Sequence, residues 1–236
     1  MNNSNPWVLS DSLVSVNNTA THLTMSDMSQ RKRPSAKRLE CHLQETRGFG
    51  KPKVDLEQYV TPPHIAAQML HFIDSKYNDL YGKFVADLGC GTGRLSIGCI
   101  LCGASQVTGF DIDRKALHMA LDNVDFILGP HKITRTLRDE TEEGQANLPT
   151  RVYQHCKKVN FVCADIANLT SCDDDSLIGS ADKKFDTVIM NPPFGTKNNQ
   201  GIDMVFLKQA IRMSAGSVYS LHKTSTRDVS CLPSGG

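Results

Sequence analysis

Apolar and polar positions alternate along the chain in two rhythms that predict a layered α/β fold. Short runs rich in β-branched residues end in glycine or aspartate, as in KFVADLG and VTGFDID, and indicate buried strands. Between such runs lie segments whose apolar residues recur at helical spacing, for example PPHIAAQMLHFI and RKALHMALDNVDFIL. Strands that alternate with helices predict a mostly parallel sheet covered by helices on both faces.

Five strands are predicted in this way, in KFVADLG, VTGFDID, VNFVCADI, FDTVIMN and SVYSLHK, with a helix over about 203–213 before the last. Two segments lack these strand and helix patterns. Residues 129–157 are polar and charged, which predicts an inserted surface loop. Residues 1–30 are rich in Asn, Ser and Thr without sustained periodicity, which predicts a disordered N-terminal tail.

Length and charge set limits on the classes of protein to consider. A chain of 236 residues is enough for one α/β domain with a buried core, but not for two of ordinary size. The formal net charge of +1 means that a nucleic-acid interface would have to be a local patch. One basic cluster, between Arg31 and Arg38, is either the solvated start of a helix or a phosphate-contacting or nuclear-import patch. No apolar run approaches the roughly 20 residues needed to span a bilayer, so we expect no membrane association.

The eight cysteines do not predict a metal site. Only Cys99 and Cys102 form a C-x-x-C pair, and no second pair lies at zinc-binding spacing. Both lie in the apolar run LSIGCILCGA, where small residues favour packing of a helix on a sheet. The start of the sequence lacks the pattern of a signal peptide, so we expect reduced thiols.

The turn DLGCGTG follows the first predicted strand and precedes a helix. Gly89 and Gly91 allow the backbone to turn sharply and to approach a ligand closely, with Thr92 beside them. Arg94 stands where a dinucleotide-binding fingerprint has its third glycine, which disfavours a nicotinamide-dependent enzyme. A turn that serves packing alone is the alternative interpretation.

Carboxylates end the next two strands. Asp111, with Asp113, follows the second strand and is suited to accept hydrogen bonds from the hydroxyls of a ribose, although a helix cap is an alternative role. Asp165 ends the third strand and can accept from the amine of a cofactor adenine, with Ile166 against the ring. The pattern predicts a nucleoside-containing cofactor.

The motif Asn191-Pro192-Pro193-Phe194 follows the fourth strand and is the most specific signal in the chain. The prolines fix the backbone so that a carbonyl points into the cleft, and Asn191 adds a side-chain acceptor beside it. Together they can accept both hydrogens of a planar amine and leave its lone pair free, while Phe194 stacks on the ring. A proline-rich turn is the structural alternative. A target base would have to be exposed, which is easier in single-stranded or looped RNA.

These motifs extend to a family resemblance that covers about residues 31–228, apart from the insertion. The resemblance rests on the segments KPKVDLEQYVTPPHIA, VADLGCGTGRLSIG, GFDID, FDTVIMNPPFGTKNNQGIDMVFL and VYSLHKTSTR. They resemble the methyltransferase-like protein 5 family, eukaryotic N6-adenosine methyltransferases of small-subunit ribosomal RNA. The resemblance implies a Rossmann-like class I methyltransferase domain over 31–228 and S-adenosyl-L-methionine as cofactor.

The resemblance also implies site residues and a partner. Gln58 and Thr61 would contact the cofactor from the segment before the first helix of the domain, and the remaining positions match family binding positions: Gly89, Asp111, Asp165, Ile166 and Asn191. The family works with a small zinc-binding methyltransferase activator protein that pairs along the sheet edge. We therefore expect an exposed edge near the strands that end at Asp111 and Asp165. Localisation in the nucleus and cytoplasm is expected.

The sequence also departs from the family. Thr92 and Arg94 are also expected to lie beside the cofactor and to contact it, although Thr92 stands where relatives can carry Cys and Arg94 where they can carry an aliphatic residue. The class I fold has seven strands, whereas residues 229–236 form a short polar tail in place of the last two, which suggests a truncated product of reduced stability. A glutamine amide is another planar amine that the N-P-P motif can hold, so a protein glutamine-amide methyltransferase is one alternative. The other, which follows from the missing strands, is a catalytically inactive truncated chain that binds the activator or RNA.

Overall fold

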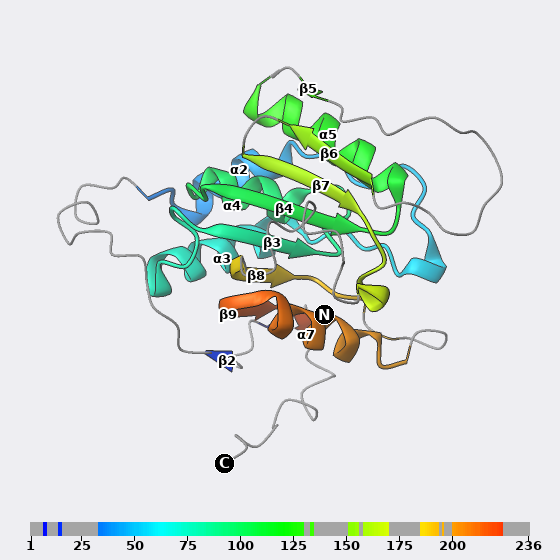
Figure 1. Ribbon diagram of the computed structural model, residues 1–236. Coiled ribbons are helices and arrows are strands. Elements are labelled where there is room, and N and C mark those ends of the chain that lie inside the picture. Colours follow the sequence, from blue (N-terminus) through cyan, green and yellow to red (C-terminus); the bar gives the residue numbers. More distant parts are fainter. Residues whose placement is uncertain are drawn as a thin grey trace, which may run out of the picture.

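The structure is a computed structural model in which one α/β domain is built around a central sheet (Figure 1). The residues that it describes are 7–8, 14–15, 33–129, 133–134, 151–155, 158–169, 185–193, 195 and 200–223. The predicted tail 229–236, and the predicted tail 1–30 apart from two short strands, lie outside this part of the chain.

All five predicted strands form the parallel centre of an eight-stranded sheet, in the spatial order β9-β8-β3-β4-β7. Their bounds are Phe84–Leu88 (β3), Gln106–Asp111 (β4), Val159–Cys163 (β7), Phe185–Met190 (β8) and Ser214–Ser220 (β9). Ala86 in β3 pairs with Thr108 on one side and with Val188 on the other. The predicted mostly parallel sheet is confirmed.

The chain order reverses at β3. From β3 the chain continues to β4 on one side, whereas β8, which follows later, lies on the other side of β3. In open parallel sheets, such a switch point leaves a crevice outside the carboxyl ends of the strands, and ligands bind there. The sequence motifs that carry chemistry all follow the carboxyl ends of β3, β4, β7 and β8.

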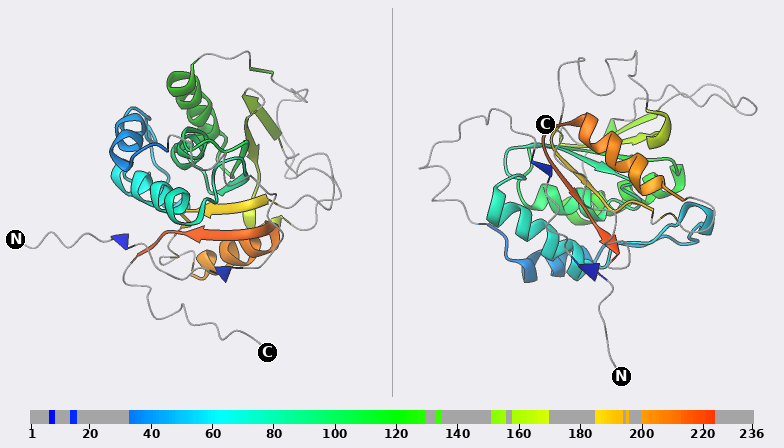
Figure 2. Two further views of the ribbon diagram at one scale, coloured as in Figure 1. Left: turned by 90° about the vertical axis from the view of Figure 1, so that its left-hand side faces the viewer. Right: turned by 90° about the horizontal axis from the view of Figure 1, so that it is seen from below.

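Helices cover both faces of the sheet (Figure 2). Four lie on one face: α2 (Ala36–Gln44), α3 (Pro63–Phe72), α4 (Arg94–Leu101) and α5 (Arg114–Leu128). Helix α7 (Ile202–Met213) lies on the other. Short helical turns cover Val54–Leu56 (η1), Ile73–Tyr77 (η2, a π-helix) and Ile166–Asn168 (η3).

The two layers have separate apolar cores on either face of the sheet. Under α2 to α5, fully buried residues such as Leu39, Leu70 and Ile97 pack together. Under α7, Phe110, Phe185 and Phe206 are among the packed side chains. Because strands of a parallel sheet are buried on both faces, the continuous apolar runs of the sequence follow directly from this arrangement.

One prediction about the sheet edge is wrong. The predicted loop 129–157 contains the strands β5 (Ile133–Thr134) and β6 (Arg151–His155). Strand β6 pairs antiparallel with all of β7 and therefore covers the edge that the family resemblance leads one to expect exposed. At the opposite edge, β2 (Val14–Ser15) pairs antiparallel with β9, and β1 (Trp7–Val8) pairs with β10 (His222–Lys223).

Candidate active site

The glycine-rich turn between β3 and α4 is shaped by three backbone positions that favour glycine. Gly89, Gly91 and Gly93 have φ angles of 70°, 53° and 79°, a region that side chains with a Cβ rarely adopt. A Cβ on Gly91 would lie 2.9 Å from Cζ of Phe49. The turn therefore holds its backbone close to the segment that crosses it, at Phe49.

Asp111 connects this turn to the end of β4. The backbone N–H of Gly91 donates to Asp111 Oδ2 over 2.8 Å, and the N–H of Asp113 donates to Oδ1 over 2.8 Å. Burial raises the pKa of the Asp111 carboxyl, although these two hydrogen bonds and Lys53 act in the opposite direction. Each carboxylate oxygen accepts more than one hydrogen bond, so both can still accept from the hydroxyls of a ribose.

A covering arm, residues 46–61, lies along the cavity and is fastened by Arg94. The Arg94 guanidinium donates to Thr46 Oγ1 over 2.6 Å, to the Thr46 carbonyl over 2.9 Å and to the Thr61 carbonyl over 2.6 Å. Burial lowers the pKa of Arg94. The sequence predicts a cofactor contact for Arg94. The structure places it on the cavity wall and also gives it this clamping role, which no sequence signal indicated.

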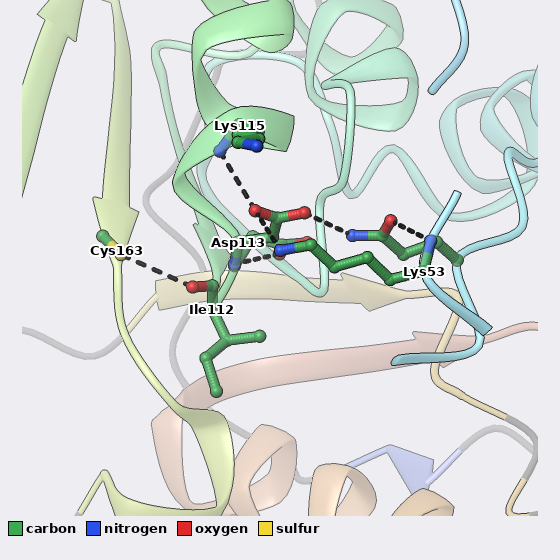
Figure 3. A network of polar contacts seen from close by, with 7 residues as sticks. Lys53, Ile112, Asp113, Lys115 and Cys163 are labelled. Carbon is green, nitrogen blue, oxygen red and sulfur yellow. Dashed lines mark hydrogen bonds and ion pairs between the residues drawn. The ribbon is translucent and has the colours of Figure 1, made fainter. Parts of the chain in front are cut away.

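The middle of the covering arm is fastened to Asp113 (Figure 3). Lys53 Nζ lies 2.9 Å from Asp113 Oδ1, and Gln58 Nε2 donates to Asp113 Oδ2 over 2.7 Å. The side-chain carbonyl of Gln58 accepts from the Lys53 N–H over 2.8 Å. Desolvation alone would raise the pKa of Asp113, but these hydrogen bonds and the Lys53 charge lower it. Gln58 thus lines the cavity, while its polar atoms hold the arm.

Asn191 follows β8 and meets the other end of the covering arm. Its Nδ2 donates to Thr61 Oγ1 over 2.9 Å. Its Oδ1 is buried and has no hydrogen-bond partner among the described residues. A buried acceptor without a donor is costly and is rare in folded proteins. This oxygen is therefore the candidate acceptor for a ligand N–H.

Asp165 and Ile166 form the wall below the end of β7. Asp165 caps η3, since its carboxylate accepts from the Ala167 N–H over 2.9 Å and from Asn168 Nδ2 over 2.8 Å. Ile166 is buried beside it. Ile112, which the sequence analysis missed, is 50% exposed and also lines the cavity. Its place directly after Asp111, inside the motif DID, was the available signal.

One cavity brings most predicted site residues together at the switch point. Its walls include eleven of them: Gln58, Thr61, Gly89, Gly91, Thr92, Arg94, Asp111, Asp165, Ile166, Asn191 and Pro193. Pro192 is buried behind the cavity wall, and Phe194 lies outside the described residues. Sequence reasoning missed apolar residues of the cavity wall, among them Phe49, Tyr59, Ile112 and Phe206.

The described residues contain no cluster of three or more metal-ligating side chains. Cys99 and Cys102 are 0% and 2% exposed and belong to the core under α4, so they pack as predicted. In the same part of the chain, no helix combines the length and the apolar character needed to cross a membrane.

The fold and the cavity define a class of protein. A parallel sheet with a glycine-rich turn after its central strand, a carboxylate after the next strand and an N-P-P motif after the fourth is the arrangement of a Rossmann-like methyltransferase. The sequence model described as "Ribosomal protein L11 methyltransferase (PrmA)" matches residues 64–166. That match includes the predicted cofactor-binding residues from Gly89 to Ile166, but not Gln58, Thr61 or Asn191.

Comparison with curated proteins gives the family. The chain is 46% identical to rRNA N(6)-adenosine-methyltransferase METTL5 of Danio rerio, over 81% of this chain and 76% of that one. It is 44% identical to Mettl5 of Drosophila melanogaster, over 81% and 74% of the two chains. The chain belongs to the METTL5 family of rRNA N(6)-adenosine methyltransferases, and its cofactor is S-adenosyl-L-methionine.

A solved structure supports the same assignment. A candidate RNA methyltransferase from Pyrococcus horikoshii superimposes with a TM-score of 0.60 at 30% identity. The match covers 82% of this chain and 77% of that one. A second crystal structure, from Thermoplasma acidophilum, matches with a TM-score of 0.51 at 28% identity, over 83% and 76% of the two chains. The Rossmann-like methyltransferase fold is confirmed.

Proposed function

We propose that this chain transfers a methyl group from S-adenosyl-L-methionine to the N6 amine of an adenosine in small-subunit ribosomal RNA. The main supporting observation is the environment of the Asn191 side chain. Its side-chain carbonyl is buried without a partner among the described residues, next to a cavity that suits a nucleoside cofactor. The names of the relatives, which are rRNA N(6)-adenosine methyltransferases, support the substrate.

The residues present fit the methyl donor. The turn at Gly91 has no room for a Cβ, as expected where a backbone must lie against a ligand. The Asp111 carboxylate would accept from the ribose hydroxyls, Asp165 would accept from the adenine amine, and Ile112 and Ile166 would contact the ring. When bound, S-adenosyl-L-methionine supplies an electrophilic methyl group.

Arg94 offers a further contact for the donor. Its three hydrogen bonds go to uncharged oxygens of Thr46 and Thr61, while its guanidinium lines the cavity. A guanidinium has five N–H donors, so two remain after these bonds. A buried charge is stabilised by an opposite charge, and the carboxylate of the donor's methionine part supplies one.

Asn191, Pro192 and Pro193 would act by positioning the target amine. Asn191 Oδ1 would accept one N–H of the amine, and the backbone carbonyl held by Pro192 and Pro193 would accept the other. The nitrogen lone pair is then left free for attack. The amine nitrogen becomes acidic only once it is methylated, so the site requires no general base before the transfer. Catalysis therefore rests on orientation and on exclusion of water.

We also propose that a small zinc-binding activator protein completes the sheet at β6. Strand β6 has five residues, of which β5 pairs with His155 and Gln154. The remaining edge, Arg151 to Tyr153, is suited to strand addition by a partner. Hydrogen exchange of 151–155 should slow when the activator is added, and unchanged exchange would contradict this pairing.

The experiment that tests the proposed activity compares this chain with its Asn191→Ala variant, each purified with the activator. Labelled S-adenosyl-L-methionine and small-subunit ribosomal RNA are supplied. We expect label in N6-methyladenosine with the parent chain and a loss of about 100-fold or more in the variant, the magnitude of losing an oriented polar contact at a reacting group. Equal binding of the donor by both proteins shows that the variant is folded.

A further inference from the structure

A chain of hydrogen bonds runs from α4 through the covering arm to the N-P-P motif. Arg94 Nη1 donates to the Thr61 carbonyl over 2.6 Å. The hydroxyl oxygen of the same threonine accepts from Asn191 Nδ2 over 2.9 Å. Thr61 is 6% exposed, so water has little access to compete for these contacts. The segments joined in this way lie 130 residues apart in the sequence.

We propose that Thr61 is a positioning residue, whose hydroxyl oxygen receives Nδ2–H of Asn191, restrains rotation of the carboxamide and so keeps Oδ1 available as the acceptor for the substrate amine. This inference rests on the proposed adenine methylation. It differs from the expectation, taken from the family resemblance, that Thr61 contacts the cofactor.

The carboxamide needs such a device because its two ends have nearly the same shape and opposite hydrogen-bonding character. Rotation by half a turn would exchange the acceptor Oδ1 for the donor Nδ2. A donor at that position would oppose the N–H groups of the amine. A threonine hydroxyl can donate as well as accept, so it does not by itself distinguish the two ends. In the observed orientation it receives Nδ2–H, and this contact restrains rotation of the carboxamide while Oδ1 is left free.

Three features of the structure restrain Thr61. The guanidinium of Arg94 holds its carbonyl and also binds the side chain and carbonyl of Thr46. Pro62, the next residue, restricts the backbone of Thr61 to extended conformations. Helix α3 begins one residue later, at Pro63. The Thr61 hydroxyl therefore lies on a restrained backbone segment between the covering arm and α3.

Substitution by residues of nearly equal size isolates the hydroxyl. Thr61→Val removes the acceptor and keeps the β-branched shape, whereas Thr61→Ser keeps the acceptor. Thr108→Val is a matched control, because Thr108 is a buried threonine in β4 that does not line the cavity. The readouts are kcat at saturating ribosomal RNA and donor, and the Kd for the donor measured separately.

We expect kcat to fall by about 10- to 100-fold in Thr61→Val, the scale of a misplaced reacting group, while Thr61→Ser and Thr108→Val stay near the parent value. An unchanged kcat in Thr61→Val overturns the inference, whatever happens to the Kd, since a cofactor contact would change the Kd alone. If Thr61→Val is fully active while Asn191→Ala is inactive, only the inference fails. If the parent chain itself transfers no methyl group to the RNA, the proposed function fails first.

Discussion

Arg94 and Gln58 each line the cavity and also fasten the covering arm, two roles that a sequence pattern cannot separate. The N-P-P motif and the carboxylates after the strands were recognised from residue type and position, because each follows a strand that the apolar pattern locates. The partners of Arg94 and Gln58 were not predictable. They depend on which parts of a distant segment pack against the start of α4 and against Asp113, and no local pattern encodes that packing.

Asp87, at the end of β3, gives a prediction about pH. Burial raises the pKa of its carboxyl from 3.8 to about 7, although Ser96 Oγ donates to it over 2.6 Å. An acid whose pKa is raised by folding is protonated in the native state and ionised in the unfolded state between these values. Stability is then present at low pH and is lost as the pH rises from 3.8 towards 7, by up to about 1.4 kcal/mol per pH unit.

Urea unfolding of the parent chain and of Asp87→Asn at several pH values measures this contribution. The difference between the two free energies of unfolding should grow in favour of the asparagine variant as the pH rises from 5 to about 7. Two curves that remain parallel over that interval would show that Asp87 is not the group responsible.

Gly91 gives a prediction about donor binding. In Gly91→Ala the new Cβ meets the ring of Phe49 at 2.9 Å, and the φ angle of 53° strains an alanine. The turn should shift to relieve this strain in the free variant, and restoring it on donor binding costs about 1–2 kcal/mol, so calorimetry should show a Kd for S-adenosyl-L-methionine raised by about 5- to 30-fold. Gly50→Ala is the control, because no atom lies within 4 Å of its added Cβ. Equal Kd values in the two variants would refute the role of the turn.

At the scale of elements, helices and strands were predictable because their apolar residues repeat with the period of the element. The bounds of α3, α5 and four of the five parallel strands agree closely with the apolar runs that predicted them, whereas β9 begins at Ser214, three residues before the run SVYSLHK. Strand β6 was missed because RVYQH has no alternation of apolar and polar residues and lies in a charged segment. Its strand conformation depends on pairing with β7, a tertiary contact.

The hydrogen bond that fastens the covering arm to Asp113 leads to a prediction about donor dissociation. Gln58→Glu replaces a donor to Asp113 with a second carboxylate, and the like charges would release the middle of the arm. The donor should then dissociate faster, and its Kd should rise by about 10-fold, since contact between like charges costs about 1–2 kcal/mol at a partly exposed site. Gln68→Glu on the exposed side of α3 makes the same chemical change away from the cavity. Stopped-flow dissociation rates that are equal in both variants would contradict the arm's role.

For the whole molecule, the order β9-β8-β3-β4-β7 brings the ends of four strands to one crevice, with the covering arm across it. The alternation of strands and helices predicted the parallel sheet, but not which edge β6 would occupy. Because the donor would contact β3, β4, β7 and the arm together, its binding should stabilise the domain as a unit. At about 100 times its Kd, the donor should add about 2.7 kcal/mol. A thermal melt should then shift upwards by about 5–10 °C, and an unchanged melt would exclude a native donor site.

We propose that the methyl group goes to an adenine amine in RNA and not to a glutamine amide in a protein. The most direct measurement supplies the chain and its activator with labelled donor and intact small ribosomal subunits, then separates RNA from protein and identifies the labelled product by mass spectrometry. We expect label in N6-methyladenosine that is lost with Asn191→Ala. Label found in the protein fraction, or adenosine label that persists in that variant, would contradict it.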